Sequence, residues 1–176
     1  EVSGNKTLGG SSRGGGIYCQ PLTTLNNSTI SGNSTAASTG GGVYATNVTL
    51  DHSTVSGNKT LASLSDGGGV FAKNQISLNH SLVNGNSSNG NGGGLSASSV
   101  AIIQSTVSEN NTIRHWRGGG IYCNSLTMDQ SSVTANSASS EGGGIYCKSS
   151  AVIANSEVVG NSTSDKFVDG GGIYNA

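Results

Sequence analysis

Histidine and aspartate side chains are the first candidates for chemistry in this sequence. His52 and His80 occupy equivalent positions in neighbouring repeats, beside Asp51 and Asn79 respectively. Two imidazoles could begin a metal site, but even a catalytic zinc takes three protein ligands. No third ligand is evident from the sequence. We therefore interpret the two histidines as a solvated pair at a corner of the fold, and we expect no metal and no other cofactor.

The carboxylates are too scattered for acid–base catalysis. Asp51 and Asp129 share a repeat position but stand three repeats apart, about 14 Å if the repeats stack as β-strands. The two carboxyl groups of a glycosidase are about 5–9.5 Å apart. Glu141 and Asp169 precede neighbouring glycine triplets, with Arg117 one repeat earlier, and we interpret them as a surface charge ladder rather than an acid–base or Ca²⁺ site. We expect no catalytic residues, and so no enzyme.

Composition narrows the class of protein further. Only 10% of the 176 residues are charged, and the net charge is −1. A nucleic-acid-binding protein would need a basic face to neutralise phosphates, so we expect no nucleic-acid partner. No apolar run approaches the 18 or so residues that cross a bilayer, so we expect no membrane span in this segment.

The sequence consists of repeats of about 26 residues. Glycine triplets followed by an apolar residue begin at seven positions with spacings of 24 to 28 residues, namely 14, 40, 67, 92, 118, 142 and 170. A second motif keeps step with the triplets, in the forms "STISGN", "STVSGN", "SLVNGN", "STVSEN", "SSVTAN" and "SEVVGN". The segment from each triplet to the next motif Asn has nearly constant length, whereas the segment that follows varies. This pattern is typical of a solenoid with variable loops on one edge.

Alternating apolar and polar columns indicate strands rather than helices. The aligned repeats give apolar columns such as Ile17, Val43 and Val70, and small polar columns of Ser and Asn that do not vary within the chain. Period-two alternation in short β-branched runs broken by glycine predicts strands, and stacked copies predict an all-β, right-handed parallel β-helix of about seven coils. We expect residues 1–176 to form a single solenoid, as a segment of a longer array or as a stacking subunit. The invariant Ser and Asn predict hydrogen-bonded ladders.

The pattern "GGG[IV]Y…S-x-[VI]-x-x-N" resembles the right-handed β-helix repeats of microbial surface proteins, namely polymorphic outer-membrane proteins and autotransporter passengers. Their repeats carry GG[AI] and FxxN, whereas Val or Ile stands here in place of that Phe. The resemblance covers essentially the whole chain and implies an extracellular or cell-surface location. The same rod carries adhesins, pectate-lyase-like enzymes and fibres, so the fold does not settle the function.

Cysteines and sequons offer two kinds of covalent modification. Cys123 and Cys147 share a column of neighbouring coils, so they are either a candidate disulfide or two buried thiols in place of alanine, and we favour the thiols. Asn-X-Ser/Thr sequons are numerous, and their coincidence with the coil period would suit a glycoprotein. Candidate acceptors in turns or on the outer face are Asn26, Asn47 and Asn79, and candidates in the ladder are Asn5, Asn33, Asn58, Asn86, Asn110 and Asn161.

Loops and an outward-facing tyrosine column are the candidate contacts for a partner. The loop "NTIRHWR" holds the only Trp, and "STSDKFVD" holds one of two Phe residues. Exposed aromatic residues on one edge favour a contact surface, although such loops could also fold back over their own coil. The contact candidates are Trp116, Arg114, His115, Phe167, Tyr18, Tyr44, Tyr122 and Tyr146.

We interpret the chain as a non-enzymatic structural protein, a shaft or filament subunit that stacks end to end with copies of itself. Two alternatives stay open. One is an adhesin that binds a host or carbohydrate ligand through the loop edge, and the other is a pectate-lyase-like carbohydrate-active enzyme.

Overall fold

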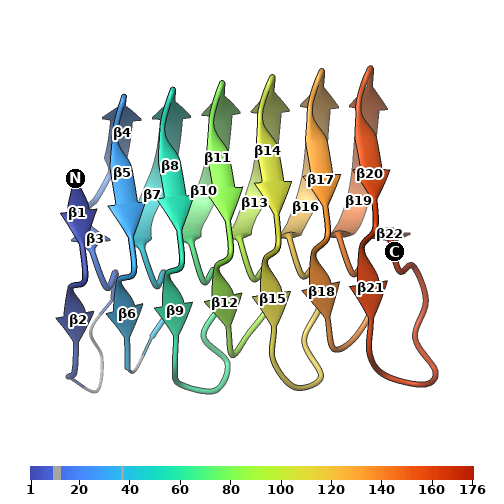
Figure 1. Cartoon of the computed structure of the whole chain (residues 1–176), viewed down its shortest axis with the longest axis horizontal. Coiled ribbons are helices and arrows are strands. Elements are labelled where there is room, and N and C mark those ends of the chain that lie inside the picture. Colours follow the sequence, from blue (N-terminus) through green and yellow to red (C-terminus); the bar gives the residue numbers. More distant parts are fainter. Residues whose placement is uncertain (10–12, 37) are drawn as a thin grey trace.

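In a computed structural model, which describes residues 1–9, 13–36 and 38–176, the chain winds into a parallel β-solenoid of about seven coils (Figure 1). The described residues form strands, turns and loops, without a helix. In Figure 1 the front strands run downward, the back strands run upward, and the coils advance from left to right. The winding is therefore right-handed, and the predicted fold is confirmed.

Three parallel sheets run the length of the rod. We name them the middle, short and long sheets, in the order in which each coil meets them.
The middle sheet contains β1 (Val2–Ser3), β5 (Thr29–Ser31), β8 (Thr54–Ser56), β11 (Leu82–Asn84), β14 (Thr106–Ser108), β17 (Ser132–Thr134) and β20 (Glu157–Val159).
The short sheet contains β2 (Lys6–Thr7), β6 (Ser34–Thr35), β9 (Lys59–Thr60), β12 (Ser87–Ser88), β15 (Asn111–Thr112), β18 (Ser137–Ala138) and β21 (Ser162–Thr163).
The long sheet contains β3 (Ile17–Tyr18), β4 (Leu22–Asn26), β7 (Val43–Asp51), β10 (Val70–Asn79), β13 (Leu95–Ile103), β16 (Ile121–Asp129), β19 (Ile145–Ala154) and β22 (Ile173–Asn175).

The apolar columns of the sequence become the core. Register pairs such as Val70 with Val43 and with Leu95 stack like residues directly on one another. Alternate residues of the long strands β7, β10, β13 and β16 point inward and are buried, as are the central valines or isoleucine of the middle strands from β5 to β17. Because a strand alternates its faces, the outward positions of the same strands carry Ser, Thr, Lys and Tyr.

Each coil turns three corners, and each corner has its own backbone requirement. Between the long and middle sheets one residue per coil has φ near +47°, which is the left-handed region. We name this edge the imidazole–amide corner.
It is formed by Asn27, His52, His80, Gln104, Gln130 and Asn155.
The corner between the middle and short sheets holds the ladder asparagines, and the variable loops and glycine triplets join the short sheet to the long one.

The three glycines of a triplet serve three different needs, as the triplet at Gly67 illustrates. Gly67 has a φ of +67°, so it turns the chain. A Cβ on Gly68 would lie 2.4 Å from the backbone oxygens of Gly93 and Ser87, because two other segments stack against it there. A Cβ on Gly69 would lie 3.0 Å from the Asn86 side chain. The triplet is therefore a corner into which the asparagine ladder packs.

Candidate functional site

The ladder asparagines hold neighbouring coils together. The Oδ1 atom of Asn86 accepts hydrogen bonds from the backbone nitrogen and Nδ2 of Asn58, at 2.9 and 3.0 Å. Its Nδ2 donates to Val55 and Asn84 carbonyls and to Oδ1 of Asn110, at 3.0, 3.1 and 2.9 Å. The amide thus satisfies buried backbone groups that have no strand partner at this corner.

This role conflicts with glycosylation of four ladder candidates. Asn33, Asn58, Asn86 and Asn110 are at most 1% exposed, and each Nδ2 atom donates within the ladder. A glycan on Nδ2 would have to enter the core, so these four positions are excluded as acceptors in the folded rod. The physical reason is that the sequon pattern reports residue type, whereas modification needs an accessible amide.

The remaining sequons are more accessible. Asn5 and Asn26 are exposed, and Asn47, Asn79 and Asn161 are half-buried. The Nδ2 atom of Asn79 donates to Asp51 at 2.6 Å, and that of Asn161 donates to the Val133 carbonyl at 2.8 Å. Asn26 therefore combines exposure with the turn position that the sequence assigned to it, and its glycosylation stays a prediction.

The tyrosine column points away from the core, but much of it is covered. Tyr44 is 3% and Tyr146 is 6% exposed, so these two side chains do not offer a free contact surface, contrary to the prediction. Rings stack along the rod with centroids 5.2 to 5.4 Å apart, in the series Tyr18–Tyr44–Phe71 and Tyr122–Tyr146–Tyr174. Each ring covers its neighbour, a consequence of coil stacking that one repeat cannot reveal.

Cationic side chains lie over three rings of the tyrosine column. Arg13 lies over the ring of Tyr44, Arg117 over that of Tyr146 and Lys148 over that of Tyr122, at 4.9 to 5.1 Å from the centroids. Such cation–π contacts stabilise the stack. Tyr18, at 54% exposed, is the member that stays open to a partner.

Arg117 also forms an ion pair with Glu141, from Nε to Oε2 at 2.7 Å. The Ser140 hydroxyl donates to the same carboxylate at 2.6 Å. These two hydrogen bonds, the Ser140 one foremost, lower the pKa of Glu141 to about 2. Glu141 is thus a fixed anion at neutral pH, suited to holding a loop rather than to transferring protons.

The variable loops form one edge of the rod, and two of them are joined. His115, with a side chain 89% exposed, pairs through Nδ1 with Oδ2 of Asp165 at 2.9 Å. This contact links the loop after β15 to the loop after β21, across the short loop after β18. Phe167 is 97% exposed and Arg114 is exposed, as the contact prediction requires.

Trp116 differs from the expectation of an exposed aromatic residue. It is half-buried, and its carbonyl accepts hydrogen bonds from the Thr112 hydroxyl and the Ser140 backbone, both at 3.0 Å. Two edge loops earlier, after β9, Leu61 and Leu64 are 47% and 72% exposed, so they do not cover their own coil. The apolar side chains on this edge are therefore Phe167 and the leucines more than the tryptophan.

The structure has Cys123 and Cys147 as buried free thiols in register on β16 and β19, and the disulfide alternative is not realised. The Cys147 thiol donates to the carbonyls of Asn124 and Ser150, at 3.2 and 3.0 Å. Burial raises the pKa of the Cys123 thiol, which keeps it protonated. Both behave as core residues in a column that holds alanine at Ala45, Ala72 and Ala97.

Three candidate metal ligands lie close together at the imidazole–amide corner. Asp51, His52 and His80 each offer a ligand atom, and these atoms all lie within 4.8 Å of one another. The Asn79 amide and His52, in that order, lower the pKa of Asp51. No third ligand beside the histidines was predicted from the sequence, and Asp51 supplies one. The available signal was its position directly before His52, at the end of β7.

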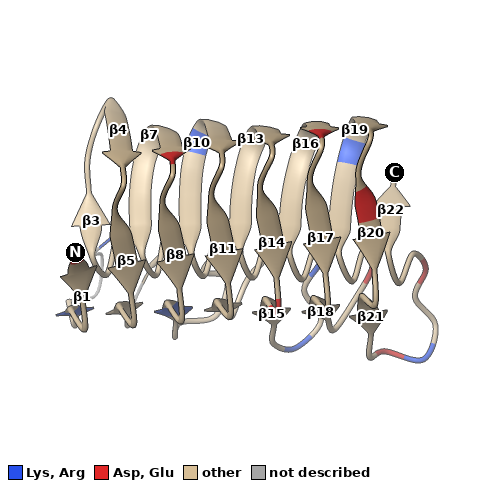
Figure 2. Cartoon of the chain, turned by 45° about the horizontal axis from the view of Figure 1, so that its top comes forward, with Lys and Arg blue, Asp and Glu red and all other residues tan. Residues whose placement is uncertain are grey.

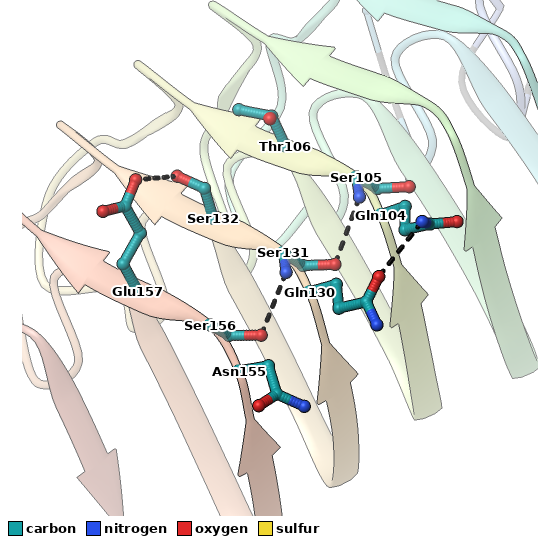
Figure 3. A pocket seen from close by; sticks show the side chains of 9 residues that line it. All are labelled: Gln104, Ser105, Thr106, Gln130, Ser131, Ser132, Asn155, Ser156 and Glu157. Carbon is teal, nitrogen blue, oxygen red and sulfur yellow. Dashed lines mark hydrogen bonds between the residues drawn. The ribbon is translucent and has the colours of Figure 1, made fainter.

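A shallow groove follows this corner along the rod. Figure 3 shows the part lined by Gln104, Gln130 and Asn155, by the serine ladder, and by outward residues of the middle sheet. The backbone nitrogen of Ser105 donates to Oγ of Ser131 at 3.1 Å, and Nε2 of Gln104 donates to Oε1 of Gln130 at 3.1 Å. Towards the N-terminal coils the groove continues past His80, His52 and Leu82.

Charged residues are few over the rest of the surface. Figure 2 shows isolated charged positions on the strands, with most of the coloured segments at turns and loops. Among the described residues, no helix is long and apolar enough to cross a membrane.

Comparison with known families gives a partial match. Residues 130–148, from the imidazole–amide corner of one coil to Lys148 on β19, match the Chlamydia polymorphic membrane protein repeat. No curated protein and no solved structure matches the chain significantly. The match falls on a "SSVTAN…GGGIYC" coil, whose motifs recur through the other coils. One coil of this parallel β-helix is therefore similar to the repeat of the polymorphic membrane proteins, a surface-associated family.

Proposed function

We propose that this chain is a rigid, non-enzymatic shaft of an extracellular or cell-surface protein, able to stack end to end. The observation that carries the proposal is the continuity of three parallel sheets and of the asparagine ladder through the coils. Every coil is bonded to the next by backbone and side chain alike, so the rod resists bending. A long, narrow body held mainly by nearest-neighbour contacts suits display at a distance.

The ladder is directional, which supports head-to-tail stacking. In each amide-to-amide bond the coil nearer the N-terminus donates, as when Nδ2 of Asn5 donates to Oδ1 of Asn33 at 2.9 Å, whereas Nδ2 of Asn33 donates back to the Val2 carbonyl at 2.9 Å. The two faces of a coil therefore present different groups, and a contact between unlike faces is heterologous. Such a contact repeats without closing and builds a filament.

Sedimentation velocity over a range of concentrations, with electron microscopy of the same samples, tests the stacking. We expect particles longer than one rod, whose number grows with concentration. Val158 packs against the core at the end coil, and Val159 beside it points outward and is 57% exposed. V158K should abolish stacking because it places a charge where a second copy would bury apolar surface. V159K is the matched control, and monomers at every concentration would contradict the proposal.

The non-enzymatic part of the proposal rests on the placement of the acids. Asp51 and Asp129 end strands β7 and β16, three coils apart, and Glu141 is held by Arg117 and Ser140. Incubation with polygalacturonate should give no new reducing ends and no unsaturated product. Release of either would favour the pectate-lyase-like alternative.

A second candidate function is adhesion through the loop edge. It is favoured by the His115–Asp165 contact, which fixes two loops together, and by Phe167, which is exposed beside Asp165. A hydrophobic ring held on an ordered edge suits contact with a sugar face or a partner protein. On a glycan array, F167A should lose binding, whereas L8A, a change of an exposed residue near the other end of the rod, should retain it. Equal signals for the two variants would contradict adhesion at this edge.

A further inference from the structure

We propose that Asp51, His52 and His80 bind one divalent transition-metal ion, which we expect to be Zn²⁺, at the imidazole–amide corner where β7 and β10 end. Two imidazoles and one carboxylate are a donor set that suits zinc, and three protein ligands leave one position for water. Neither the proposed shaft nor the proposed adhesion requires such a site.

The backbone positions the three side chains before any ion arrives. His52 and His80 occupy the same corner position on successive coils, with φ of 47° and 46°. Their backbone nitrogens donate to the carbonyls of Asn79 and Ile103, at 3.0 and 3.2 Å, so strand pairing continues through the corner. Asp51 and Asn79 are register partners at the ends of β7 and β10. The three Cα positions are therefore fixed by the coils themselves.

The two histidine side chains lie against each other but can still rotate. The imidazoles stack with centroids 4.7 Å apart and an interplanar angle of 6°. A bound ion lies in the plane of each ring, so both rings must turn about their side-chain bonds for their lone pairs to converge. Both histidines are exposed, and the turn breaks their ring stack together with the contacts of His52 with Asp51 at 3.2 Å and of His80 with Asn79 at 3.1 Å.

The carboxylate is prepared for a cation by its neighbour. Nδ2 of Asn79 donates to Oδ1 of Asp51 at 2.6 Å, which orients the carboxylate. Among the described contacts Oδ2 of Asp51 has no hydrogen-bond partner, so it can face the ion. Carboxylates that bind metals are usually held by such hydrogen bonds from neighbouring groups, which fix the orientation of the carboxylate.

The rest of the corner provides an internal comparison. Its other positions carry amides, and Asn155 donates to Oδ1 of Asp129 at 2.9 Å in the coils that lack imidazoles there. Asp129, Gln130 and Asn155 thus repeat the backbone of the proposed site without its nitrogen ligands. Amides are weak ligands for zinc, so this second place should bind none.

Isothermal titration with ZnCl₂ alone tests the proposal. It uses the full chain carrying C19A, which removes a half-buried thiol and restores the residue that other coils have in that column. We expect one ion per chain. H80Q should weaken binding at least about tenfold, as should D51N. Gln already occupies the same corner on the next coil, at Gln104, so H80Q should fold normally, which circular dichroism would check.

Two further variants separate this site from other zinc contacts. H115Q removes the remaining histidine, which is also paired with an aspartate, and should leave the affinity unchanged. The double variant Q130H/N155H should add a second ion per chain beside Asp129. The proposal is overturned if the parent binds no stoichiometric zinc, if H80Q and D51N bind as the parent does, or if H115Q alone abolishes binding.

Discussion

The asparagine ladder shows how much one side chain can contribute in this fold. Asn86 bonds to two neighbouring coils, and its amide is 1% exposed. Its column meets the third glycine of the first six triplets, which leaves no room for a larger group at either position. Because a buried amide or carbonyl without a partner is costly, the ladder tolerates no gap.

Asn86→Ala should lower the free energy of unfolding by about 3 kcal/mol or more, because several buried backbone groups lose their partners. Asn84→Ala, two residues earlier, removes one contact, from Nδ2 to the Ser108 hydroxyl at 3.1 Å, and should cost less than about 1 kcal/mol. Urea denaturation followed by circular dichroism measures both. Equal losses would contradict the structural role assigned to the ladder.

Glu141 gives a prediction for pH at the same scale. Its pKa is lowered from 4.5 to about 2 in the folded rod, so the unfolded chain binds the proton more readily. The resulting stability is fully present above pH 4.5 and is lost as pH falls through that value towards 2. The pair is partly exposed, so the effect should be on the order of 1 kcal/mol.

Denaturation midpoints of the parent and of Glu141→Gln between pH 7 and pH 2.5 check this dependence. The difference between the two proteins should shrink as the pH falls. Comparing them removes the opposite trend from Asp66, whose pKa burial raises. A difference that stays constant with pH would show that the ion pair contributes nothing.

At the scale of elements, glycines occur at two kinds of corner for different physical reasons. Gly68 sits where another coil and the short sheet approach its Cα, whereas a Cβ on Gly85 would meet nothing within 4 Å. The corner of Gly85 also accepts other residues, because Glu109 and Ala135 stand at the equivalent place with φ of 56° and 53°. One glycine is therefore required by packing, and the other is favoured by conformation alone.

Gly68→Ala should destabilise the rod by at least about 3 kcal/mol, because backbone oxygens 2.4 Å from the new Cβ would have to move. Gly85→Ala should cost about 1 kcal/mol, the strain of a non-glycine residue at positive φ. Thermal melting of the two variants side by side distinguishes these effects. Similar melting temperatures would show that coil spacing relaxes more easily than the structure implies.

At the scale of the whole molecule, the coil is the unit of construction. The stack of aromatic rings is interrupted where Ser96 stands between Phe71 and Tyr122, while the three sheets continue unbroken. Stability in such a solenoid is a sum of coil terms and coil-to-coil terms. A complete coil is therefore removable, whereas part of one is not.

Deleting the 26 residues from Gly92 to Arg117 should leave a folded rod shorter by about 4.8 Å. Phe71 and Tyr122 would then be neighbours in the stack. Small-angle scattering and far-ultraviolet circular dichroism measure length and strand content. Deleting only residues 92–104 should unfold the adjacent coils, because every later column would fall out of register. A folded half-coil variant would contradict the proposed unit.

The sequence by itself determined the coil period, the strand columns, the glycine corners and the two ladders, because each is repeated along the chain and stacking turns repetition into contact. Only the tertiary structure decided which outward groups are covered and which meet. Tyr44 is buried by rings and a cation from other coils, and His115 reaches Asp165 past an intervening loop. Asp51 lies close to His52 and His80 because of side-chain orientations that aligned repeats do not show. Such contacts depend on residues that do not repeat along the chain, and the repeat period does not predict the contacts of these residues.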